Sequence, residues 1–192
     1  MKGLMRRGRV YRRDQLVALS KAVDRDLKNL VETGDVKKVG AGLYYRPKLS
    51  NYGPLPTEER ELLKAFLRDD DFLLVSPNLY NDLGVGLTQI YNATIVYNRK
   101  RHGTITLDGK VFDCRRPRDF PRRLSKEFLL VNLVDNLKYL AEDVSRVKER
   151  IKQITPEVDG LKLRRMAQRY GKISTRQFFE TLKLNESQTI SS

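Results

Sequence analysis

Apolar residues recur at helical spacing within residues 11–47, and turn residues interrupt them at regular intervals. The second of two predicted helices has an apolar face at i, i+4, i+7 and i+8, formed by Val23, Leu27, Leu30 and Val31. Ser20 is expected to cap this helix and Gly34 to end it. Strand patterns at 36–39 and 43–46 flank a Gly-Ala-Gly turn and predict a hairpin. This order of elements predicts a winged helix-turn-helix.

The middle of the chain alternates between short helical and short strand patterns. Three prolines within residues 46–56 favour extended backbone, so we place a domain boundary near 48–56. Thr57 and Ser76 each precede a helical pattern and are expected to cap it. Asp108-Gly109 separates two apolar runs and predicts a two-residue hairpin, because both turn positions need positive φ.

The C-terminal third carries a long apolar periodicity that predicts one helix over 124–154. Its apolar residues are spaced alternately three and four apart: Leu130, Leu133, Leu137, Leu140, Val144, Val147, Ile151 and Ile154. A coiled-coil seam and a helix buried in its own bundle both fit this spacing, and extra apolar residues in its first half favour the bundle. Thr155-Pro156 and Ser174 are expected to begin two further helices.

These patterns together predict an α+β protein with an N-terminal winged helix-turn-helix, a mixed α/β middle with antiparallel hairpins, and an α-helical C-terminus. The expected domains are 1–50, for DNA binding, and 51–192. The second would comprise a mixed α/β part over 57–123 and a helical part over 124–184. The polar segment 185–192 is expected to be disordered.

The charge of the chain changes the interpretation of this fold. The formal net charge is +14, and a large positive excess favours a polyanionic partner. Residues 1–50 contribute 13 Lys and Arg against 5 Asp and Glu, a net +8. No stretch approaches the ~20 apolar residues that a membrane span needs. The N-terminus lacks the apolar core of a secretory signal, so we expect a cytoplasmic location.

The predicted winged helix offers a specific set of DNA contacts. Its second helix would enter the major groove, where Arg25 could pair with guanine O6 and N7 and Asn29 with adenine N6 and N7. Other basic residues would contact phosphate or the minor groove. The complete predicted set is Arg12, Arg13, Lys21, Arg25, Lys28, Asn29, Lys37, Lys38 and Arg46. The alternative is a winged helix that binds protein, with its charges merely solvated.

A second group of basic residues lies in and after a predicted hairpin. It consists of Arg99, Lys100, Arg101, Arg115 and Arg116. This group could be another DNA contact, a partner surface or a solvated hairpin end.

Candidate catalytic chemistry is sparse. Asp108 and Lys110 have the D-x-K spacing of a Mg²⁺-dependent nuclease, but a plain hairpin turn explains the same residues. Cys114 is the only cysteine, which excludes an internal disulfide, and is expected to be a buried hydrophobe. The only histidine, His102, is expected at the surface. We therefore predict no catalytic residue, metal or cofactor, and no enzyme.

Three segments of the chain resemble the AbiEi family of antitoxins, from type IV toxin–antitoxin and phage abortive-infection systems. They are Asp14-x-Leu16, then Ala22-Val23-x-x-x-Leu27-x-x-Leu30-Val31-x-x-Gly34-x-Val36, then Gly42-Leu43-Tyr44-Tyr45-x-Pro47. LGVGLTQ, within 76–89, resembles a further family segment. The resemblance covers 9–125 well and the C-terminus loosely. The first helix of such domains is nearly missing, and Tyr11 stands where the family often has a Thr or Ser cap.

The resemblance implies a transcriptional autorepressor that binds inverted repeats in its own promoter through the winged helix. It further implies that the rest of the chain counteracts a nucleotidyltransferase-type toxin, with or without a stable complex. We expect a monomer or weak dimer that is cooperative on DNA. The alternatives are the nuclease using Asp108 and Lys110, and an adaptor that binds nucleic acid or toxin without promoter specificity.

Overall fold

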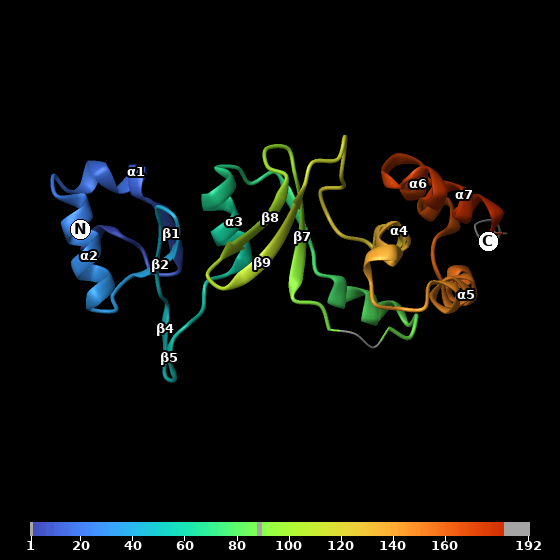
Figure 1. Cartoon of the computed structure of the whole chain (residues 1–192), viewed down its shortest axis with the longest axis horizontal. Helices are drawn as coiled ribbons and strands as arrows, with labels where there is room; N and C mark the ends of the chain where they lie inside the picture. The colour runs from blue at the N-terminus through green and yellow to red at the C-terminus, as the bar shows by residue number, and fades with distance from the viewer. Residues whose placement is uncertain (1, 88–89, 183–192) are drawn as a thin grey trace, which may run out of the picture. The chain divides into compact units, whose positions relative to one another are not determined.

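The computed structural model describes residues 2–87 and 90–182. It is a mixed α+β protein with strands and helices at the N-terminus, a central sheet and a C-terminal region of four helices (Figure 1). The chain forms two compact units. The first comprises the residues up to Phe72 together with Asn98–Arg115, and the second comprises Leu73–Tyr97 and the residues after Arg115. No helix among the described residues is long and apolar enough to cross a membrane.

The first unit contains the winged helix. Its elements in chain order are a 3-10 turn (Lys2–Leu4), β1 (Arg9–Arg12), α1 (Arg13–Leu16), a 3-10 turn (Val17–Leu19), α2 (Val23–Glu32), β2 (Lys37–Gly40) and β3 (Leu43–Arg46). The strands form an antiparallel sheet in the order β1-β3-β2. The hairpin β2–β3 is confirmed, whereas β1 was not predicted. β1 pairs along the whole of β3, with Val10 opposite Tyr45.

A small core holds α1 and α2 against the sheet. Met5 from the N-terminal turn is buried with Leu16, Val23, Leu27 and Val36. The N-terminal segment therefore supplies the apolar cover that a full first helix would otherwise give. The exposed fraction of Leu4 is 62%, so only one of the two apolar residues of this segment packs inward.

The predicted details of α2 are partly confirmed. Gly34 follows the helix at φ +74°, as a helix-ending glycine should. Val31 is 36% exposed and does not belong to the buried face. Ser20 does not cap α2 directly, because the N-cap position is Ala22. The Ser20 hydroxyl instead accepts a hydrogen bond from the Ala22 N–H, at 3.0 Å, and so fixes the turn before the helix.

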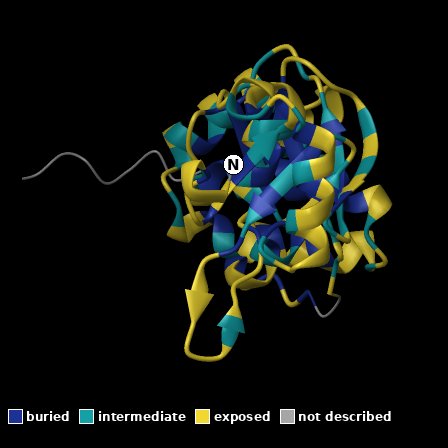
Figure 2. Ribbon diagram, turned by 90° about the vertical axis from the view of Figure 1, so that its left-hand side faces the viewer, coloured by how far each residue is buried: buried dark blue, intermediate teal, exposed yellow. Residues whose placement is uncertain are grey.

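The remaining elements of the first unit follow the winged helix. They are β4 (Leu49–Ser50), β5 (Gly53–Pro54), α3 (Glu59–Leu67), β8 (Gly103–Leu107) and β9 (Lys110–Arg115). β4 and β5 form a small projecting hairpin within the predicted linker (Figure 2). The expected boundary near 48–56 thus falls inside this unit. Asp108 and Gly109 both have positive φ in the β8–β9 turn, as predicted.

The second unit is mainly helical. Its elements are β6 (Phe72–Val75), a 3-10 helix (Pro77–Leu83), β7 (Ala93–Asn98), α4 (Lys126–Asn136), a 3-10 turn (Leu137–Tyr139), α5 (Val144–Ile154), a 3-10 turn (Thr155–Glu157), α6 (Gly160–Tyr170) and α7 (Ile173–Thr181). Inside it, the Tyr80 hydroxyl donates to Asn132 Oδ1 at 2.5 Å, and Asn132 Nδ2 donates to the Tyr97 hydroxyl at 2.6 Å. These bonds satisfy polar groups that burial would otherwise destabilise.

The single helix expected over 124–154 is wrong, because the chain breaks between α4 and α5. Leu140 adopts an extended backbone, and the Asp143 side chain accepts hydrogen bonds from the N–H groups of Ser145 and Arg146. An aspartate placed to cap a new helix competes with continuation of the old one. The periodicity survives the break because both helices bury their apolar residues in the same core, so the bundle interpretation was the better one.

Three other expected caps are also wrong. Glu58 rather than Thr57 precedes α3, and Thr57 is buried instead. α6 starts after Asp159, whose carboxylate accepts the Lys162 N–H, and Ser174 lies inside α7. Ser76 was predicted correctly, since its hydroxyl accepts the N–H of Asn78. The expected disordered tail, 185–192, lies outside the described residues.

Candidate nucleic-acid interface

The solvent-facing side of α2 and its preceding turn carries a row of polar residues. Lys21, Arg25, Lys28 and Asn29 are all exposed, while Val23 and Leu27 face the core. Apolar residues at i and i+4 bury one side of the helix, and this leaves the intervening positions in water. The four polar residues therefore project from the helix that would read DNA in a winged helix.

The acidic residues near these bases are neutralised by other groups. Asp24 forms two hydrogen bonds with the Arg13 guanidinium, at 2.6 and 2.5 Å, and this pairing lowers the pKa of Asp24. Asp26 accepts a hydrogen bond from the Ser20 hydroxyl at 2.6 Å. Arg13, which we predicted as a phosphate contact, thus also removes a negative charge from the approach to α2.

Most basic side chains of the first unit contact an acid, a backbone carbonyl or an aromatic ring. Within the described part of that unit, those without any such contact are Arg6, Lys21, Arg25 and Lys38. Lys28 has only a weak contact, 3.9 Å from Glu32 one turn along α2. Surface pairs of this kind stabilise a helix by ~0.3–0.5 kcal/mol, so a phosphate would replace the pair readily. The unpaired bases gather on α2, its preceding turn and the wing, apart from Arg6.

The wing is fixed at its base by the β8–β9 turn. Lys37 Nζ lies 2.7 Å from Asp108, whose own side chain is 5% exposed. The Asp108 N–H also donates to the carbonyl of Val39 at 2.8 Å. These bonds cover the outer edge of β2, where Lys38 remains exposed beside them. Lys38 is therefore the wing residue best placed to meet a phosphate.

Two arginines of the predicted set point into the protein. Arg46 donates to the carbonyls of Lys2 and Met5, and Arg12 donates to the carbonyls of Ala65 and Phe66. These bonds satisfy guanidinium donors that a phosphate would otherwise receive. The DNA contacts of Arg12 and Arg46 stay predictions, and we leave both residues out of the proposal below.

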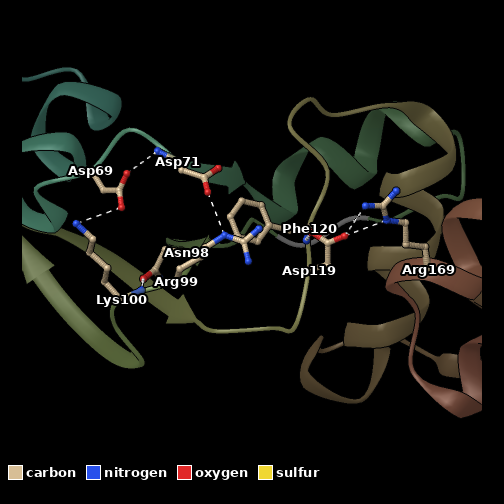
Figure 3. Close-up of polar contacts among 8 residues, drawn as sticks. All are labelled: Asp69, Asp71, Asn98, Arg99, Lys100, Asp119, Phe120 and Arg169. Carbon is tan, nitrogen blue, oxygen red and sulfur yellow. Dashed lines mark hydrogen bonds and ion pairs between the residues drawn. The ribbon is translucent and has the colours of Figure 1, made fainter.

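The basic loop at 99–101 is paired with a neighbouring acidic turn (Figure 3). Arg99 lies 3.1 Å from Asp71, and Lys100 lies 3.2 Å from Asp69. The backbone N–H of Asp71 and the Lys100 ammonium both lower the pKa of Asp69. The side chain of Asn98 accepts hydrogen bonds from the backbone N–H groups of Lys100 and Arg101 and so holds the loop in this conformation.

The other members of the second basic group are also accounted for. The Arg101 guanidinium lies over the Phe66 ring, 5.9 Å from its centroid, and Arg115 is ion-paired with Asp113 at 2.6 Å. Arg116 belongs to the second unit and is exposed. The sequence brings these residues together as one basic group, but the acids that face most of them are visible only in the fold.

The residues of the nuclease hypothesis do not converge on a common point. Asp108 is paired with Lys37, and Lys110 Nζ lies 3.5 Å from Glu59. Among residues 2–87 and 90–182, no group of three or more His, Cys, Asp or Glu could hold a metal ion. Cys114 is buried, as predicted, and burial raises the pKa of its thiol. The strongest candidate site is therefore the basic face of α2.

Comparison with known proteins leaves the geometry as the basis for inference. No protein-family model, curated protein or solved structure matches the chain.

Proposed function

We propose that the chain is a sequence-specific DNA-binding autorepressor. The observation that carries this proposal is the clustering of unpaired bases on α2, its preceding turn and the wing. Like-charged residues left without carboxylates repel one another, and a phosphate backbone relieves that repulsion while releasing condensed counterions. The fold presents these bases on a helix and a hairpin, which are the two elements that a winged helix-turn-helix uses on DNA.

In the proposed complex, α2 lies in the major groove. Arg25 is a planar donor that matches guanine O6 and N7, and Asn29 one turn later can pair with adenine N6 and N7. Lys21, Lys28 and Lys38 contact phosphates on either side of the groove and set the register. The ion pair between Arg13 and Asp24 keeps a carboxylate from repelling the backbone at the start of α2.

The resemblance to AbiEi antitoxins extends the proposal. It supports binding to inverted repeats in the chain's own promoter, in the cytoplasm, and neutralisation of a nucleotidyltransferase-type toxin. This second activity would involve the residues beyond the winged helix. Its test is coexpression with a nucleotidyltransferase-like protein encoded beside this chain. Rescue of growth is expected, and growth arrest that persists with well-expressed protein would refute the antitoxin role.

The test of the DNA-binding role is footprinting on the DNA upstream of the chain's own gene. The wild-type protein should protect paired sites related by inverted symmetry. R25A/K28A removes two exposed side chains that pack against nothing, so the variant should keep its melting temperature and lose the protection. Protection of the same sites by this variant would show that α2 is not the reading helix.

A further inference from the structure

The segment that leads into the C-terminal helices has a sharp division between its two sides. Between residues 116 and 127, the exposed residues and the basic residues are the same five. We call them the connector strip: Arg116, Arg118, Arg122, Arg123 and Lys126. Every other residue of the segment is buried or half-buried.

Both acids of this segment turn inward toward α6. Asp119 accepts two hydrogen bonds from the Arg169 guanidinium, at 2.7 and 2.9 Å (Figure 3). Glu127, only 7% exposed, lies 2.7 Å from Lys162 two turns earlier on the same helix. The acids are thereby used in anchoring the segment, and neither faces the strip. Within the described residues, no member of the strip has an acid, a carbonyl or an aromatic ring as its partner.

The segment is also firmly held. Phe120 and Phe128 are buried in the core of the second unit, and the Ser125 hydroxyl accepts the Phe128 N–H at the start of α4. A fixed backbone keeps five positive charges close together, although a mobile tail would let them spread apart. This arrangement costs electrostatic free energy unless a polyanion lies against it.

We propose that the connector strip is a second binding surface for double-stranded DNA, which contacts phosphates without reading sequence. Four of its five residues are arginines, whose planar donors match phosphate oxygens. The apolar residues of the segment all face inward, so the strip lacks the apolar centre that a protein interface needs. It also lacks exposed aromatic rings on which unpaired bases could stack. A duplex backbone is the partner that needs only charge and hydrogen-bond donors.

The salt dependence of DNA binding tests the strip. The full-length protein is titrated into a short duplex of scrambled sequence at several salt concentrations, by fluorescence anisotropy. Each lost phosphate contact lowers the slope of log K against log salt by ~0.9. R118A/R122A/R123A should therefore lower the slope by ~2.7. R118K/R122K/R123K keeps the charge and should restore most of it.

A charge-matched control separates the strip from general electrostatics. R146A/R150A/K152A removes three exposed bases from α5 in the same unit and should change the slope by well under half as much. An unchanged slope in the strip variant, or an equal fall in both variants, would overturn the proposal. The result is independent of the autorepressor role, which fails instead if wild-type protein binds operator and scrambled DNA equally.

Discussion

Two basic segments of the first unit look alike in sequence and differ in their surroundings. The loop at 99–101 carries three consecutive basic residues, and α2 with its preceding turn carries Lys21, Arg25 and Lys28. The loop faces Asp69 and Asp71, which bind two of its bases. The acids near α2 are bound by Arg13 and Ser20 instead, which leaves its bases toward solvent.

The difference shows what decides whether a basic segment can bind DNA. Density of Lys and Arg along the chain is similar in both places, so density alone does not separate them. The positions of the acids in the folded protein do. An ion pair already formed must be broken before a phosphate can take the base, and an unpaired base needs no such exchange.

The largest expected effect is loss of operator binding when the unpaired bases of α2 are removed. R25A/K28A should weaken binding by tenfold or more, because one bidentate base contact contributes ~1–3 kcal/mol. The measurement is an electrophoretic shift at fixed salt. R99A/K100A is the matched control, and its affinity should change less than twofold.

Disturbing the base of the wing should have a smaller effect, through packing rather than charge. A Cβ at Gly40 would lie 2.9 Å from the Leu107 side chain in the β8 strand. Gly40→Ala should therefore destabilise the fold by ~1–3 kcal/mol, as overpacking does. Thermal unfolding measures this, and Gly3→Ala, where no atom lies within 4 Å of the new Cβ, is the control. Equal stability of both variants would show that β8 does not support the wing.

Releasing the bases of the 99–101 loop should create weak DNA binding where there was none. D69N/D71N keeps the side-chain shape and removes the charges that hold Arg99 and Lys100. Two released bases should steepen the salt slope by up to ~1.8 on scrambled duplex. Isothermal or anisotropy titration of variant and wild type checks this. An identical slope would mean that the ion pairs do not withhold these residues from DNA.

The smallest effect is on acid stability. Pairing lowers the pKa of Asp69 and of Asp70, which contacts Lys64. A depressed carboxyl pKa adds stability above the unfolded value, ~3.9, and this stability disappears as the pH falls through the folded value. The melting temperature of wild type should thus approach that of D69N/D70N between about pH 5 and pH 3. Parallel pH profiles would contradict this, and the exposed positions keep the difference small.

Much of the fold follows from the sequence because local signals decide it. The hairpin β2–β3, the glycine that ends α2 and the β8–β9 turn each depend on a few adjacent residues. β1 was missed because its strand exists through pairing with β3, more than thirty residues away. The break between α4 and α5 was missed because Asp143 caps a helix inside an unbroken apolar periodicity.

The candidate site is only partly readable from the sequence. Arg25, Lys28 and Lys38 follow from helix and strand periodicity, which separates outward from inward positions. The inward roles of Arg12 and Arg46 depend on carbonyls of distant residues, such as Ala65 and Lys2. The alternation of exposed bases with inward acids in the connector strip could have been found, since residues 116–127 hold bases and acids at separate positions.

The salt dependence of operator binding tests the central claim most directly. Slopes of log K against log salt are compared for wild type, R25A/K28A and R99A/K100A, which remove equal charge from the same unit. The first variant should lower the slope by ~1.8 and the second should leave it unchanged, since its bases are held by carboxylates. Equal falls in the two variants, or a fall only in R99A/K100A, would contradict the view that unpaired bases on α2 form the DNA-binding surface.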